Sequence, residues 1–161
     1  MIKIIEYEDK YLEDVKDLLV ELEEYIISID EDKLDRLHSE YRDKMAVLDL
    51  EEVKNNEGKC YLALENNQVV GVIMGCIFPY DEYDYLDYKC PRKGEVTELN
   101  VSKKVRSSGI GQKLMNKMES YFKELGCEYI AIDVFAYNKN AIKFYEKLGF
   151  HPRGLIDIKK I

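Results

Sequence analysis

A short basic segment near the middle of the chain has the composition of an anion-binding turn. Residues 95–111 read EVTELNVSKKVRSSGIG: a strand-like stretch, three basic residues, and then Gly109 and Gly111. The apolar residues that follow have the spacing of one helical face, at Ile110, Leu114, Met118, Tyr121 and Leu125. A helix N-terminus presents free N–H groups and the positive end of the helix dipole, and glycine lets the backbone approach an anion. The segment therefore predicts phosphate binding, although a glycine-containing turn of any α/β protein reads the same way.

A second segment whose residues could take part in binding or catalysis lies about thirty residues further along the chain. Residues 138–150 read NKNAIKFYEKLGF, with Asn138 placed to cap a helix and Gly149 placed to end it. Between the two segments, Tyr129–Phe135 is a nearly continuous apolar run, typical of a strand covered on both faces. Such a strand is expected to lie parallel to Val96–Val101 through a right-handed helical crossover.

Together the two segments resemble the GNAT superfamily of acyl-CoA-dependent N-acetyltransferases. The family's phosphate loop reads Arg/Gln-x-x-Gly-x-Gly/Ala, which Arg106, Gly109 and Gly111 match. Its later helix is matched by Asn138, Ala141, Phe144, Tyr145, Gly149 and Phe150. Ser107 stands where many members have glycine. The resemblance is dense over residues 95–150 and loose before them.

The resemblance implies a fold, a cosubstrate and a set of binding residues. The fold is α/β, with a mixed, mostly antiparallel sheet, a central splayed pair of parallel strands and flanking helices, in a single domain over residues 1–161. The cosubstrate is acetyl-CoA, with its pantetheine arm between Val96–Val101 and Tyr129–Phe135, and no metal is implied. The implied cofactor-binding residues are Leu99, Asn100, Val101, Arg106, Ser107, Ser108, Gly109, Ile110, Gly111, Asn138, Ala141, Phe144 and Tyr145.

The same resemblance implies direct transfer of the acetyl group to a primary amine of a small molecule or peptide. Tyr145 stands where the family places its general acid, which protonates the departing thiolate; the other reading is a core tyrosine on an amphipathic helix. The base is Glu98 first, or Glu95, with water as a relay, and either could instead be a structural carboxylate. In a regular strand these two glutamates would point to opposite faces, so only one would act.

Composition narrows the function further. The 161 residues have a net charge of −8, which argues against general nucleic-acid binding. No apolar run approaches the ~20 residues of a membrane span, and the first residues lack the apolar core of a signal peptide. The four scattered cysteines show neither zinc spacing nor a disulfide framework, so a cytoplasmic protein is expected.

Elsewhere in the chain the patterns predict elements but little chemistry. We expect a first strand over Met1–Tyr7, a helix from Asp9 to about Ile26, a second helix capped by Ser28 or Asp30, and a short third helix over Ala46–Asn55. Cys60–Glu65 and Gln68–Phe78 predict a hairpin turning at Asn66 and Asn67. Gly71 and Gly75 indicate a bulge or a close backbone approach. Residues 150–161 predict one or two closing strands.

Two alternatives stay open. Residues 79–94 form a long connection that interleaves acidic residues with tyrosines; it could attract a cationic acceptor, or be a solvated loop or a homodimer contact. The chain as a whole could be a non-catalytic module that binds CoA as a ligand or sensor. A nucleotide-binding protein of another family is disfavoured, because neither G-x-G-x-x-G nor G-x-x-x-x-G-K-[S/T] occurs.

Overall fold

The fold is built on one mixed sheet. The computed structural model describes residues 1–105 and 108–161. The strands, in their order across the sheet, are β1 (Ile2–Glu6), β2 (Lys59–Glu65), β3 (Gln68–Cys76), β4 (Lys93–Val101) and β5 (Tyr129–Ile132). Neighbouring strands are antiparallel except β4 and β5, which are parallel. The predicted fold class is thereby confirmed.

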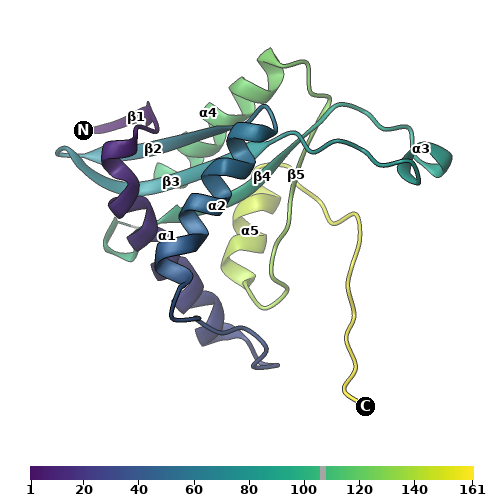
Figure 1. Ribbon diagram of the computed structural model, residues 1–161, viewed down its shortest axis with the longest axis horizontal. Helices are drawn as coiled ribbons and strands as arrows, with labels where there is room; N and C mark the ends of the chain where they lie inside the picture. Colours follow the sequence, from purple (N-terminus) through teal and green to yellow (C-terminus); the bar gives the residue numbers. More distant parts are fainter. Residues whose placement is uncertain (106–107) are drawn as a thin grey trace.

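Helices cover both faces of the sheet (Figure 1). They are η1 (Asp9–Tyr11), α1 (Leu12–Ile29), α2 (Tyr41–Asn55), α3 (Asp84–Asp87), η2 (Lys103–Val105), α4 (Ile110–Glu124) and α5 (Lys139–Lys147). On one face α1 and α2 pack against Leu62, Val72 and Met74. On the other, α4 and α5 pack against Tyr61 and Ile73. Alternate residues of each strand point to opposite faces, so the strands contribute side chains to both cores. None of the described helices combines the length and the apolarity needed to cross a membrane.

The hairpin between β2 and β3 forms as predicted. Asn66 and Asn67 connect the strands with φ values of 50° and 64°, which asparagine tolerates better than most residues. Gly75 lies at an irregularity between β3 and β4, as its position in the strand predicted. A Cβ on Gly75 would lie 2.8 Å from the Glu95 carbonyl oxygen, so the two backbones approach closely there.

The region between the first two helices differs from the prediction. No helix begins at Ser28 or Asp30; residues 30–40 form a loop, and one helix, α2, replaces the two that were predicted. The Asp30 carboxylate accepts backbone hydrogen bonds from Asp32, Leu34 and Asp35, at 2.9, 2.5 and 2.9 Å. These local bonds offer the backbone an alternative to the helical ladder, so they stabilise the loop.

The C-terminal segment is a second correction. Residues 150–161 form no strand and lead away from the sheet (yellow in Figure 1). Leu155, Ile156 and Ile158 are exposed, because the segment has no sheet face on which to bury them. The predicted strand Tyr129–Phe135 also ends early, at Ile132. Because no described strand lies beyond β5, the parallel pair β4–β5 is at one edge of the described sheet.

Candidate active site

An extra residue in β4 shapes the site. Met74 of β3 pairs with Glu98, but the next residue, Gly75, pairs with Val96, so Thr97 is a bulge with no partner position on β3. The parallel ladder between β4 and β5 ends beside this bulge, at the pair Val96 and Ile132. Beyond that point β4 continues for five residues, to Val101. The end of the ladder lies where the predicted splay requires an opening between the two strands.

The bulge corrects the expectation that Glu95 and Glu98 face opposite sides of the sheet. Their register partners, Cys76 and Met74, are two residues apart on β3, so both positions belong to one face. That face is the one covered by α1 and α2, because Met74 packs in their core. Glu95 forms an ion pair with Lys93, at 3.4 Å. Two residues three positions apart normally point to opposite faces of a strand, and the extra residue Thr97 brings Glu95 and Glu98 to the same face.

Glu98 is the more strongly perturbed carboxyl group. Burial, with a smaller contribution from the charges of Asp49 and Glu23, raises its pKa to about 8. A carboxylate with such a pKa is a stronger base than an ordinary glutamate, and it titrates close to neutral pH.

Tyr145 reaches the site from the other side of the sheet. It is 8% exposed and belongs to the core formed with α4. Its ring packs edge-on against Phe144 and Phe150, with centroids 5.2 and 5.7 Å apart. Burial raises the pKa of the Tyr145 hydroxyl, and the charge of Glu98 raises it further. The hydroxyl therefore stays protonated at neutral pH, as a proton donor must.

Glu23, Tyr41 and Asp49, which were not predicted as site residues, lie near Glu98. Burial and, to a smaller extent, the charge of Glu52 together raise the pKa of Asp49 on α2 to about 6. Burial also raises the pKa of Tyr41, and the charges of Glu23, Glu98 and Asp49 contribute. In the described part of the chain, Asp49 Oδ2 is buried and has no hydrogen-bond partner. The site therefore has an acidic lining contributed by α1, α2 and β4.

A signal for Asp49 does exist in the sequence. It lies three residues after Ala46 and four before Val53, and both of these residues are buried on α2. A carboxylate at a core-facing helical position is costly unless it has a partner or a task. The predicted helix over Ala46–Asn55 already contains these three positions, but the sequence does not show which of its faces is buried.

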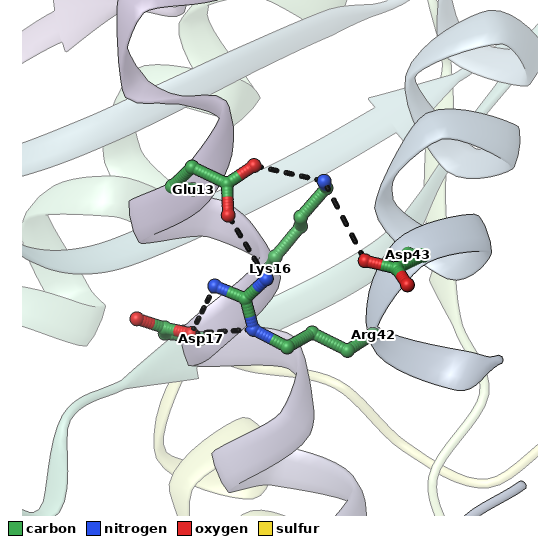
Figure 2. Close-up of polar contacts among 5 residues, drawn as sticks. All are labelled: Glu13, Lys16, Asp17, Arg42 and Asp43. Carbon is green, nitrogen blue, oxygen red and sulfur yellow. Dashed lines mark hydrogen bonds and ion pairs between the residues drawn. The ribbon is translucent and has the colours of Figure 1, made fainter. Parts of the chain in front are cut away.

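Surface ion pairs hold α2 against α1 (Figure 2). Arg42 on α2 contacts Glu13 at 2.9 Å and Asp17 at 2.8 Å, both on α1. Lys16 contacts Glu13 at 2.8 Å and Asp43 at 4.0 Å. Exposed pairs each contribute little, but a network from two helices fixes their relative position. It thereby helps to keep Tyr41 and Asp49 near Glu98.

The predicted phosphate loop is described in part. Arg106 and Ser107 lie outside the described residues. The Ser108 hydroxyl donates to the Val105 carbonyl oxygen at 2.6 Å. Gly109 has φ 76° and open space where a Cβ would stand, so its left-handed conformation, rather than crowding, favours glycine. Ile110 is buried and starts α4.

Most of the other predicted cofactor residues are apolar and partly buried. Leu99 and Val101, together with Ala141 and Phe144, pack in the core beside α4. A Cβ on Gly111 would lie 3.3 Å from the Phe144 ring, so this glycine lets α4 and α5 approach.

The side chains of two predicted cofactor residues, Asn138 and Asn100, make hydrogen bonds to the backbone. Asn138 caps α5 as predicted: its Oδ1 accepts the Ala141 N–H at 3.1 Å, which leaves its amide group to donate to a ligand. The buried Asn100 side chain donates to the Leu18 carbonyl oxygen on α1 at 2.7 Å. The Asn100 side chain therefore points to α1, and a role of this residue in holding the cofactor stays a prediction. Among the described residues, no group of histidine, cysteine, aspartate and glutamate side chains could hold a metal.

Comparison with curated proteins finds similarity to N-acetyltransferases. Human N-alpha-acetyltransferase 30 is 33% identical over 91 residues, which are 56% of this chain and 23% of that protein. An uncharacterized N-acetyltransferase of Methanocaldococcus jannaschii is 31% identical over 97 residues, which are 60% of this chain and 54% of that protein. The matched segments thus span about a quarter and about half of these relatives.

A solved structure and a family model extend the likeness over the whole fold. A protein of Pyrococcus furiosus, provisionally assigned as an acetyl transferase, superposes with a TM-score of 0.75 at 26% identity, covering 100% of both chains. The model of the acetyltransferase (GNAT) family matches residues 16–150, which include most of α1, and all of α2, the bulged strand, the partly described loop and α5. With a match over most of its length, this chain belongs to the GNAT family of acetyltransferases.

Proposed function

We propose that this protein transfers the acetyl group of acetyl-CoA to a primary amine by direct attack. Use of acetyl-CoA is the general property of the family. The observation that carries the mechanism is that Glu98 lies just past the end of the β4–β5 ladder and that Tyr145, whose pKa responds to the charge of Glu98, lies on the opposite face of the sheet. One group can act as a base and the other as an acid at a thioester held between the strands.

The cofactor would enter through the opening between β4 and β5. Backbone groups of Leu99 and Val101 would pair with the pantetheine arm, and the Asn138 amide would donate to it further along. Backbone N–H groups of residues 107–111, with Arg106, would hold the pyrophosphate at the start of α4. The left-handed Gly109 supports this placement, since its backbone is uncovered on the side where a Cβ would stand.

The proposed transfer begins with removal of a proton from the acceptor and ends with release of CoA. Glu98, directly or through water, takes a proton from the acceptor ammonium and leaves a neutral amine. The amine nitrogen attacks the thioester carbonyl carbon, and a backbone N–H of Leu99 or Val101 stabilises the tetrahedral oxyanion. The carbon–sulfur bond then breaks, and the Tyr145 hydroxyl protonates the departing thiolate. The second proton of the amine nitrogen passes through water to the tyrosinate, which leaves a neutral amide and restores the hydroxyl, and Glu98 releases its proton to solvent. Glu95 is the alternative base, because the bulge places it on the same face as Glu98.

We infer that the acceptor is cationic, as a small molecule or as a peptide amine. Glu23, Asp49 and Glu98 line its side of the site, and the charges of the other two raise the pKa of Glu98. A bound ammonium would relieve that repulsion, and Asp49 Oδ2 would gain the hydrogen-bond donor that it lacks within the described residues. Burial of an unpaired carboxylate is costly, so such a ligand would be bound favourably.

The test is an acceptor panel with acetyl-CoA and detection of the released thiol. The panel contains polyamines, aminoglycosides, amino acids and peptides with free N-termini or lysines. Turnover with a cationic amine supports the proposal. Tight CoA binding in calorimetry without turnover on any acceptor would instead indicate a non-catalytic CoA-binding protein.

A further inference from the structure

A carboxylate on α1 holds the chain at the point where β4 ends and the phosphate loop begins. Glu21 Oε1 accepts the backbone N–H of Lys103 at 2.6 Å, and Glu21 Oε2 accepts the hydroxyl of Ser102 at 3.3 Å. Ser102 is 9% exposed, whereas Glu21 is half-buried. One side chain thus contacts two consecutive residues that are 81 and 82 positions away in the sequence.

Further hydrogen bonds continue from this contact toward the start of α4. The Ser102 carbonyl oxygen accepts the Val105 N–H at 3.0 Å, and the Val105 carbonyl oxygen accepts the Ser108 hydroxyl at 2.6 Å. Ser108 immediately precedes the left-handed Gly109, from which α4 begins. The contacts therefore lead from α1, through η2, to the helix start that is expected to face the pyrophosphate.

A neighbouring contact anchors the same strand end to the same helix. Asn100 donates to the Leu18 carbonyl oxygen, one turn before Glu21 on α1. The Ser102 N–H donates to Val70 of β3 at 2.9 Å. The strand end is therefore fixed by its neighbours up to Ser102, and Glu21 extends that support by one residue, into the exposed turn at Lys103.

We propose that Glu21 is a positioning residue for the phosphate loop, an inference that rests on the proposed binding of acetyl-CoA at that loop. It contacts no cofactor atom; it acts by holding Ser102 and Lys103. A hydrogen bond from a backbone N–H to a side-chain oxygen is directional, so it fixes the position of the backbone. By contrast, a surface ion pair with the Lys103 ammonium would tolerate many geometries.

Two variants of Glu21 distinguish the effect of side-chain length from the effect of charge. Glu21→Gln keeps the length, because its amide oxygen can accept the Lys103 N–H and its amide nitrogen can donate to the Ser102 hydroxyl. Glu21→Asp keeps the charge but is one methylene shorter, so it cannot make both contacts without moving the backbone. Glu24, exposed three residues later on the same helix, supplies the control Glu24→Asp.

The experiment measures CoA binding by calorimetry and the steady-state constants of the intact chain. Loss of the paired contacts in Glu21→Asp should raise the Kd for CoA and the KM for acetyl-CoA about tenfold. The Glu21→Gln variant should stay within about threefold of the natural protein. For both variants, kcat at saturating acetyl-CoA and the KM of the acceptor should be unchanged, as should every constant of Glu24→Asp.

Three outcomes would overturn the role of Glu21. Glu21→Asp could bind CoA like the natural protein, Glu21→Gln could lose as much affinity as Glu21→Asp, or kcat could fall while the KM stays constant. Thermal unfolding of each variant verifies that the comparison is made on folded protein. If the natural protein itself binds no CoA, the proposed function fails, whereas normal binding with equal affinities in both variants rejects the positioning role alone.

Discussion

Glu98 and Tyr145 lie on opposite faces of the sheet, and the charge of Glu98 contributes to the raised pKa of the Tyr145 hydroxyl. The pKa of Glu98 is itself raised, to about 8. The two groups therefore titrate above the usual range of a carboxyl and a phenol, and both are protonated in the free protein at neutral pH. Catalysis then requires Glu98 to lose its proton while Tyr145 keeps its own.

The first prediction is a rising limb in the pH–rate profile. The active form has an ionised Glu98, so kcat/KM for acetyl-CoA should rise through about pH 8. A cationic acceptor lowers the pKa of Glu98 in the complex, so the limb of kcat should lie at lower pH. Glu98→Gln should remove the Glu98 limb and reduce turnover by roughly 10²–10⁴-fold. A limb near pH 8 that survives in Glu98→Gln would assign the proton transfer elsewhere.

The second prediction concerns stability. The unfolded chain ionises Glu98 near its ordinary pKa of 4.5, whereas the folded protein keeps the proton up to about pH 8. Because the folded state binds the extra proton, stability is full below pH 4.5 and is progressively lost as the pH rises to 8. Glu98→Gln lacks this loss, so at pH 8.5 it should be more stable than the natural protein by about 1–4 kcal/mol.

Thermal unfolding at pH 4.5 and pH 8.5 checks this expectation. Asp49 is unchanged in both proteins, so its own titration affects them alike. Equal pH dependence of the unfolding temperature in the natural protein and in Glu98→Gln would show that burial does not hold the proton on Glu98.

The third prediction tests the phosphate loop. Gly109→Asp should weaken CoA binding far more than Lys117→Asp, because it introduces a side chain at φ 76° and an anion at the start of α4. Gly109→Ala separates the two causes, since it adds only the backbone strain of about 1 kcal/mol. Calorimetry with CoA is the measurement, and equal losses in Gly109→Asp and Lys117→Asp would reject the loop as the phosphate site.

The fourth prediction concerns the charge of the acceptor. Asp49→Asn should raise the KM of a cationic acceptor about tenfold and leave that of a neutral amine of similar size nearly unchanged. The KM of acetyl-CoA should not respond. If the best substrate of the panel were a strongly anionic amine, the acidic lining from Glu23, Asp49 and Glu98 would have to serve another purpose.

Local signals were sufficient to predict much of this arrangement. The paired asparagines gave the hairpin, the run Tyr129–Phe135 gave most of the parallel strand, and Asn138 gave the cap of α5. Each of these depends on residues that are close in sequence, where backbone preference and capping chemistry act directly. The same holds for the glycine at the start of α4.

Features that depend on tertiary pairing could not be predicted in this way. The bulge at Thr97 follows from how β4 pairs with β3, and without it a spacing of three places Glu95 and Glu98 on opposite faces. Asp49 acquires its role only because the packing of α2 on β2 and β3 brings it near Glu98. The loop after α1 depends on a competition within the chain, in which Asp30 binds nearby backbone N–H groups and prevents the helix that the apolar spacing had favoured.

The most direct measurement of the central claim is the turnover of Tyr145→Phe with the acceptor that the panel identifies. The change removes only the hydroxyl and keeps the ring that packs against Phe144 and Phe150. Folding and CoA affinity should therefore be normal, while kcat should fall by roughly 10²–10⁴-fold, the usual effect of losing a positioned general acid. Near-normal kcat in this variant would contradict the account, since the thiolate would then receive its proton from water or from the substrate.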